Sequence, residues 1–132
     1  MSPQQDSDPI ELISSLPFDK TVDRLISAIA DAGMTVFARI DHAANARQSD
    51  LTMPPAIVLI YGNAKGGTPV MQAVPQTALD LPLRVLVRED VDGHAVVSFH
   101  PVIPMLQRAG VPDGLAVRLN PARRLLVAAV QP

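Results

Sequence analysis

The chain has 132 residues, a length typical of one domain with its own core. A net charge of −2 and an aromatic content of only 3%, with no tryptophan, argue against the basic patches and base-stacking platforms used in nucleic-acid binding. The absence of cysteine excludes disulfides, thiolate nucleophiles and cysteine-ligated metal centres.

The N-terminal segment lacks the basic region and the apolar run of a signal peptide. No apolar run in the sequence approaches the roughly 20 residues needed to span a membrane. We therefore expect a cytoplasmic protein without a membrane partner. Residues 1–8 are polar and are predicted to form a disordered or extended tail, and residues 9–132 are predicted to form a single α/β domain.

The first predicted elements are a short strand within residues 9–16 and a helix over residues 20–32. The helix is indicated by apolar residues at i, i+3, i+4, i+7 and i+8, which are Val22, Leu25, Ile26, Ile29 and Ala30. Asp19 or Thr21 is suited to cap its start, and Gly33 is placed to end it in the left-handed conformation.

The next segment predicts a strand, a short helix and a second strand. Residues 34–40 alternate apolar and polar side chains, which places Arg39 on the opposite face from Val36 and Ile40. Asp41 is suited to cap an alanine-rich helix that follows it. Residues 56–61 are continuously apolar and predict a strand buried on both faces.

A glycine-rich segment, Gly62–Thr68, follows this buried strand, and Thr68 and Pro69 are suited to begin a helix that runs to about Val74. Backbone N–H groups before a helix attract anions, and Lys65 adds a positive charge. The pattern is not a Walker A loop, because its lysine precedes the paired glycines. We predict ligand binding here, with a purely structural strand-to-helix turn as the alternative. The predicted binding residues are Gly62, Asn63, Lys65, Gly66, Gly67 and Thr68.

Residues 83–88 and 94–100 alternate as two strands of a hairpin around Asp90–Gly93. A three-residue loop with Gly93 in the left-handed conformation pairs Val87 with Val97, which keeps one face apolar. The other face then carries Arg84 opposite His100, together with Arg88. These side chains are suited to bind a carboxylate or phosphate, to pair with nearby acids, or simply to remain solvated.

The C-terminal third predicts a helix over residues 101–109, ended by Gly110, and a terminal helix that begins near Asn120 and Pro121. The apolar run of residues 125–130 alone is equally compatible with a strand. Together these elements predict an α+β fold, a two-layer α/β domain. Its sheet is mostly antiparallel or mixed, with about 4–5 strands and helices packed on one face.

Several of these segments, in this order, resemble the bacterial and archaeal family known as domain of unknown function 302. The resemblance rests on ARIDHAANA at residues 38–46, YGN at 61–63, GTPVM at 67–71, LDLPLRVLV at 79–87 and the turn EDVDG at 89–93. It covers residues 18–130 and implies a small two-layer α/β domain that forms a homodimer, with no assigned activity. The family usually has proline at the position of Ala64.

Three functional hypotheses remain open at this level. The first is a dimeric domain that binds an anionic small molecule through Gly62–Thr68, with Arg39, Arg84 and His100 nearby. The second is an uncharacterised hydrolase or lyase in which His42 is the general base and Asp41 orients it. The third is a protein-interaction module. No two histidines lie three or four residues apart, so no metal site or cofactor is predicted.

Overall fold

The structure is a computed structural model and describes residues 8–131, so the tail predicted for residues 1–8 lies almost wholly outside the described residues. Five strands form one sheet in the order β1-β5-β4-β3-β2, and each neighbouring pair is antiparallel. This confirms the predicted α+β class. The strands are β1 (Ile10–Ile13), β2 (Thr35–Asp41), β3 (Ala56–Gly62), β4 (Leu83–Glu89) and β5 (Ala95–Phe99).

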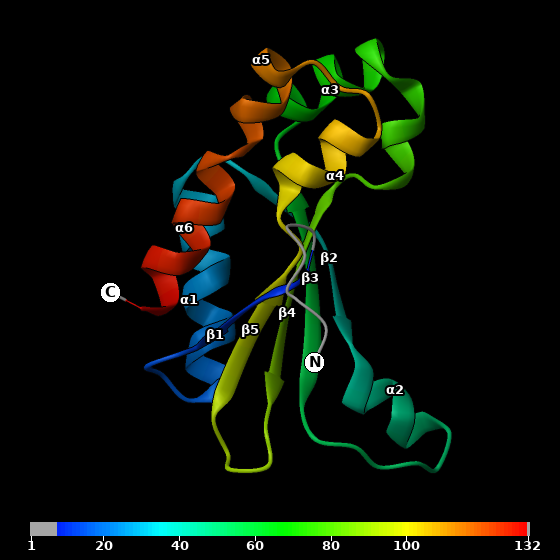
Figure 1. The fold of residues 1–132 in the computed structure, drawn as a ribbon. Helices are drawn as coiled ribbons and strands as arrows, with labels where there is room; N and C mark the ends of the chain where they lie inside the picture. The colour runs from blue at the N-terminus through cyan, green and yellow to red at the C-terminus, as the bar shows by residue number, and fades with distance from the viewer. Residues whose placement is uncertain (1–7, 132) are drawn as a thin grey trace, which may run out of the picture.

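Helices cover one face of the sheet and one of its ends (Figure 1). The longest, α1 (Phe18–Asp31), lies beside the C-terminal α6 (Pro121–Val130), so residues 121–130 are helix and not strand. The end of the sheet is capped by α3 (Ala64–Ala73), α4 (Val102–Arg108), α5 (Asp113–Ala116) and the short 3₁₀ turns η1 (Pro75–Leu79) and η2 (Val117–Leu119). The remaining helix is α2 (His42–Gln48). Within residues 8–131, no helix has the length and apolar character needed to cross a bilayer.

Two apolar clusters hold these layers together. The larger one fills the space between the sheet and the pair α1 and α6, where Leu25, Leu59 and Val85 are fully buried. The smaller one lies inside the helical cap, around Val70 and Leu106. Burial of apolar side chains contributes about 25 cal/mol for each Å² removed from water, so the larger cluster is the main source of stability.

The N-terminal caps predicted for α1 and α6 are wrong. Helix α1 begins after Pro17, earlier than predicted, and has no side-chain cap at its start. Thr21 is instead fully buried inside the helix, and its hydroxyl donates a hydrogen bond to the Ser14 hydroxyl at 2.7 Å. Asn120 does not cap α6, because η2 leads directly into that helix and gives Asn120 helical angles. The left-handed Gly33 after α1 is confirmed, with φ of 78°.

Strand β2 contains an irregularity that reverses the predicted faces. Val36 pairs with Tyr61, but the register then shifts, and Ala38 pairs with Ile60. A bulge of this kind inserts one residue and turns every later side chain to the other face. Arg39 therefore pairs with the buried Leu59, on the helix-covered side, and the prediction that it lies opposite Val36 is wrong.

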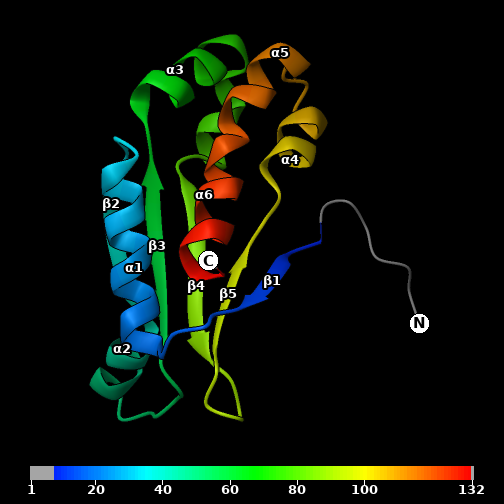
Figure 2. The ribbon, with the colours of Figure 1, turned by 90° about the vertical axis from the view of Figure 1, so that its left-hand side faces the viewer.

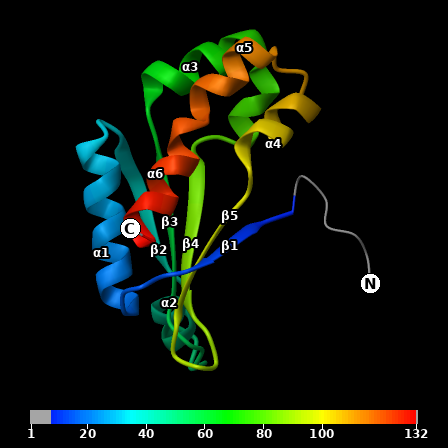
Figure 3. The ribbon, with the colours of Figure 1, turned by 60° about the vertical axis from the view of Figure 1, so that its left-hand side comes forward.

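Strand β3 was predicted to be buried on both faces, and the structure corrects this. Leu59 and Tyr61 face the main core, whereas Val58 and Ile60 on the other face are only half-buried. In Figure 3, α1 and α6 lie together on one side of the sheet, and α2 lies at one end of it. A run of apolar residues in one strand does not reveal whether helices cover both of its faces.

The predicted hairpin between β4 and β5 is confirmed in both register and turn. Val87 pairs with Val97, and the backbone N–H of Asp90 bonds to the His94 carbonyl at 2.9 Å. Gly93 has φ of 84°, the left-handed geometry that the three-residue loop requires.

Candidate ligand-binding cavities

Helix α3 begins earlier than the glycine-rich pattern predicted, because Asn63 caps it. The Asn63 side chain accepts a hydrogen bond from the Lys65 N–H at 2.9 Å, and its carbonyl accepts from Gly66 and Gly67 at 3.0 and 2.9 Å. Asparagine is a stronger N-cap than threonine. The N–H groups of these three residues, which were expected to face an anion, are thus already bonded. Ala64 takes the first helical position, where the proline of the family pattern also fits.

One face of α3 opens onto a cavity of ≈ 360 Å³. Asn63, Gly66, Gly67 and Met71 line it, at the spacing of a single helix face. A Cβ added to Gly67 would find its nearest neighbour, Met71 Cε, at 3.9 Å, so this position leaves open space. A Cβ added to Gly66 would instead lie 3.2 Å from Leu119 Cδ2, so Leu119 packs against that position. The cavity therefore exists partly because Gly67 carries no side chain on the inner face of the helix.

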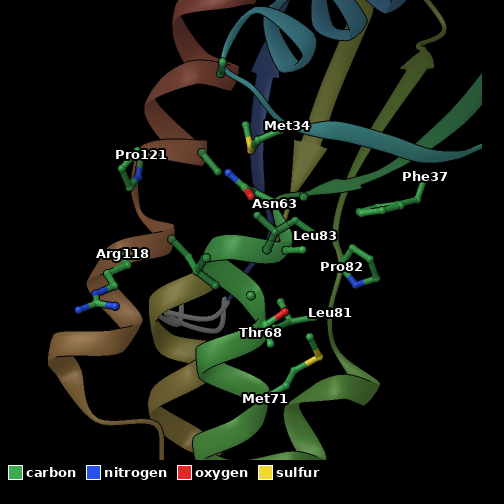
Figure 4. A pocket seen from close by; sticks show the side chains of 17 residues that line it. Met34, Phe37, Asn63, Thr68, Met71, Leu81, Pro82, Leu83, Arg118 and Pro121 are labelled. Atoms are coloured by element: carbon green, nitrogen blue, oxygen red, sulfur yellow. The ribbon is translucent and has the colours of Figure 1, made fainter.

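The remaining walls come from segments distant in sequence and are mainly apolar. Figure 4 shows Phe37 and Pro82 at one end, Arg118 and Pro121 at the other, and Thr68 between them. The other apolar lining residues are Ala32, Met34, Ala64, Leu81, Leu83, Leu119 and Ala122. A site of this kind suits a small ligand with an apolar body.

Three side chains supply the polar groups of this cavity: Asn63, Thr68 and Arg118. Within the described part of the chain, the Thr68 hydroxyl has no hydrogen-bond partner and Arg118 has no ion-pair partner. Arg118 is exposed, and in Figure 4 its guanidinium points away from the other labelled side chains, so it lies at the rim. Asn63 and Thr68 are also exposed, so the polar groups lie where the cavity meets solvent and can bond there to one polar group of a ligand.

The cavity gathers five of the residues predicted from the glycine-rich segment: Gly62, Asn63, Gly66, Gly67 and Thr68. Lys65 is exposed and does not line it. The sequence analysis missed Arg118, because residues 110–119 were assigned to no element. Their short helical turns carry no periodic pattern long enough to be recognised.

Arg84 and His100 line a second, smaller cavity of ≈ 160 Å³, whereas Arg39 lines neither cavity. The smaller cavity also contains Tyr61, a core residue that the sequence analysis did not consider as a ligand-binding group. The residues predicted to form one anion site are therefore divided between two cavities, with Lys65 and Arg39 outside both.

The predicted acid–base pair does not form a site. Asp41 caps α2, and its carboxylate accepts a hydrogen bond from the Ala44 N–H at 2.9 Å. His42 is exposed, lines neither cavity, and has no hydrogen-bond or ion-pair partner among residues 8–131. A general base needs a neighbouring substrate site and an orienting group, and the structure places neither at His42.

The hairpin turn brings together three groups that the sequence analysis did not combine. Ligand atoms of Asp90, Asp92 and His94 all lie within 4.8 Å of one another. The Asp90 carboxylate, however, already accepts hydrogen bonds from the N–H groups of His94 and Asp92 at 2.8 and 3.0 Å. The His94 N–H is the main cause that lowers the pKa of Asp90. These contacts are those of an ordered surface turn.

The chain is similar to known proteins in both sequence and fold. The family model described as "Domain of unknown function DUF302" matches residues 10–131. A similar fold occurs in the crystal structure of an uncharacterized conserved protein DUF302 from Bacillus stearothermophilus. Its TM-score is 0.79 at 15% sequence identity, and the match covers 92% of this chain and 94% of that chain. This likeness shows the fold.

Curated relatives include the "Fluoride-specific ion channel FluC 1" of Brucella suis biovar 1 (strain 1330) and that of Brucella abortus biovar 1 (strain 9-941). Each is 34% identical over 101 residues, which is 75% of this chain. The aligned region is 40% of the first channel and 37% of the second, so the chain spans about two fifths of the length of these relatives.

Proposed function

Because the chain belongs to the DUF302 family, whose function is unknown, we propose a role from its own geometry: a cytoplasmic domain that binds a small, mainly apolar molecule carrying one polar or anionic group. The cavity of ≈ 360 Å³ on the glycine face of α3 carries this proposal. Ligand cavities in proteins have volumes of about 300–1,000 Å³ and combine apolar walls with a few polar groups.

The lining indicates which part of the ligand lies where. Phe37, Leu81 and Met71 offer contact to an apolar body, and the unpartnered Thr68 hydroxyl can bond to a polar group. Arg118 at the rim can neutralise an anionic group that reaches solvent. A free ion without an apolar body gains little here, because moving a charge into apolar surroundings is costly. Fluoride, the ion named in the channel relatives, is therefore not the ligand we propose.

Filling the cavity tests the proposal. In a thermal-shift titration with hexanoate and 1-hexanol, a probe at about 100 times its dissociation constant adds roughly 2.7 kcal/mol of stability to the folded state. Gly67→Leu places a side chain in the open space and should remove the shift. Gly67→Ala, which adds one methyl group at the same position, is the matched control and should retain it.

Two results would contradict the proposal. One is the absence of any shift with both probes in a folded wild-type protein. The other is an equal shift in Gly67→Leu, which would place the probes elsewhere. Sodium fluoride is titrated in parallel, and a specific shift with fluoride alone would favour an ion site over the cavity described here.

We also propose that the domain self-associates through the sheet face opposite α1 and α6. This face carries half-buried apolar side chains, among them Ile60 and Leu86, and the exposed Ile13, which is 57% accessible. It also carries both charges of one ion pair, Arg88 with Glu11 at 3.5 Å. A two-fold axis can place the positive group of one copy opposite the negative group of the other.

The oligomeric state in solution tests this second proposal. Light scattering coupled to gel filtration should give the mass of a dimer for the wild type and of a monomer for Ile60→Glu. Ile13→Glu changes an exposed side chain on the same face and should also give a monomer. It tests the face even if Ile60→Glu fails to fold. Val91→Glu, at the fully exposed hairpin tip, is the control. A monomeric wild type, or dimers of both face variants, would refute the assignment.

A further inference from the structure

The second cavity lies where two neighbouring strands separate. The ladder between β4 and β5 ends at the pair Leu86 and Ser98, two residues short of Arg84 and His100. Beyond that pair β5 separates from β4, although Phe99 still pairs with Ile10 of β1, and the chain then continues toward α4. Helix α6 runs along the widening gap (Figure 2). Side chains of α4 and α6 only partly fill the space between the strands, and ≈ 160 Å³ remains open.

Tyr61 lines this cavity and carries the clearest sign of a missing partner. The residue is 2% exposed, and its hydroxyl forms no hydrogen bond with any residue of the described chain. Among residues 8–131, Ser98 Oγ is the one fully enclosed side-chain nitrogen or oxygen without a partner. The Tyr61 hydroxyl is therefore in contact with the open space of the cavity, where a bound molecule can replace water.

The cavity is also predominantly cationic. Arg84 and Arg123 line it, and neither has an ion-pair partner in residues 8–131. His100 adds a group that can donate hydrogen bonds, and Asp80 is the one acidic side chain in the lining. Arginine guanidinium groups match the geometry of a carboxylate, to which they donate two parallel hydrogen bonds.

We propose that this second cavity binds a small monocarboxylate with a short alkyl chain. The Tyr61 hydroxyl and the Arg123 guanidinium donate to the carboxylate from the helix-covered side of the sheet. The Arg84 side chain, which pairs in register with Ile60 on the opposite face, donates through the gap between β4 and β5. The alkyl chain packs against the apolar lining, which is formed by Leu79, Leu83, Phe99, Val102, Met105, Ala122 and Leu126. A doubly charged phosphate fits less well, because most of the wall cannot donate a hydrogen bond.

This site is separate from the glycine-faced cavity, although Leu83 and Ala122 contribute to both. The proposal does not depend on ligand binding in the first cavity. Gly67→Leu fills the first cavity only, so the propionate titration is repeated in that variant.

The chain contains one tyrosine and no tryptophan, so its intrinsic emission comes from Tyr61 alone. A hydrogen bond from a tyrosine hydroxyl to a carboxylate lowers tyrosine emission. Titration with sodium propionate at constant ionic strength should therefore give a saturable decrease, in the wild type and in Gly67→Leu. Propionamide, which has no charge, should give none. N-acetyltyrosinamide, titrated with propionate, measures the linear decrease in tyrosine emission that collisions alone produce.

Four variants decide whether the signal comes from the proposed contacts. Arg84→Gln and Arg123→Gln change exposed side chains and should each weaken the apparent affinity for propionate about tenfold. Arg124→Gln changes the neighbouring exposed arginine of α6, which lines neither cavity, and should leave the affinity unchanged. Tyr61→Phe removes the emission, so its weaker binding is measured from propionate-induced NMR shifts of the His100 ring.

Weaker binding of propionate in Arg84→Gln and Arg123→Gln, with unchanged binding in Arg124→Gln, would support the site. A decrease that stays linear, like that of the free tyrosine derivative, would overturn it, since only water would then occupy the cavity. The same conclusion follows if all three arginine variants bind propionate equally, or if propionamide binds as well as propionate.

Discussion

The two cavities lie at the same end of the sheet and share Leu83 and Ala122, yet they arise from opposite causes. The larger one exists partly because Gly67 places no side chain on the inner face of α3. The smaller one exists because the backbones of β4 and β5 separate beyond Leu86 and Ser98. Missing side chains create the first space, and diverging backbones create the second.

This difference explains the chemistry of the two walls. A gap left by missing side chains inside a packed helical cap is lined mainly by apolar neighbours. A gap between separating strands is also bordered by the strand ends, where Arg84 and His100 reach solvent and Tyr61 still belongs to the core. We therefore expect the first cavity to select for apolar bulk and the second for a charge.

The largest expected effect on stability comes from truncating Leu83, which lines both cavities. Leu83→Ala deletes a half-buried side chain from both cavities and should lower the free energy of unfolding by about 2 kcal/mol, the low end for a leucine truncation. Urea unfolding followed by circular dichroism measures this loss. Leu79→Ala, a neighbouring change at an 83% exposed side chain, is the control and should alter stability by less than about 0.5 kcal/mol. Equal losses in both variants would show that Leu83 does not support the wall.

An intermediate effect on the free energy of unfolding is expected from Tyr61 in the second cavity, and only at high pH. Burial raises the pKa of Tyr61 well above its ordinary value of 10.0. Above pH 10 the unfolded chain releases this proton while the folded chain retains it, so stability is complete below pH 10 and falls as the pH rises toward the folded pKa. The slope approaches about 1.4 kcal/mol per pH unit. Urea unfolding between pH 8 and pH 11 should show this loss in the wild type, and a smaller one in Tyr61→Phe. An equal pH dependence of the free energy of unfolding in the wild type and in Tyr61→Phe would contradict a raised pKa of Tyr61.

The smallest effect is expected at Gly67 in the first cavity, where a substitution should increase the free energy of unfolding and not decrease it. Gly67 lies inside α3, where its backbone freedom in the unfolded chain opposes helix formation. Gly67→Ala should raise the free energy of unfolding by about 0.5–1 kcal/mol, because the added methyl group meets Met71 only at ordinary contact distance. Thermal unfolding detects this gain. A loss of stability would mean that the space facing Gly67 is not open.

Part of this molecule could be predicted from local sequence because local interactions determine it. The register of the β4–β5 hairpin follows from the alternation around Val87 and Val97 and from a glycine that can adopt φ of 84°. The presence of α1 and the position of Gly33 follow in the same way from helical periodicity and turn chemistry. The glycine-rich segment also directed attention to the surface that lines the larger cavity.

Other features depend on contacts between distant segments. The bulge in β2 moved Arg39 to the helix-covered side of the sheet, and Asn63 rather than Thr68 began α3. The alternation of residues 34–40 gave no sign of the extra residue, because a bulge is fixed by pairing with the neighbouring strand.

The sequence by itself determined the α+β class, the main elements and the family resemblance, since these depend on periodicity, turn residues and short motifs. Only the tertiary structure decided which side chains share a cavity. Arg118 reaches the first cavity from a segment without a recognisable pattern, and Tyr61 reaches the second from the middle of an apolar strand. The spacing of residues along a chain fixes local geometry, but the packing of distant elements determines where space remains and which polar groups are left without a partner.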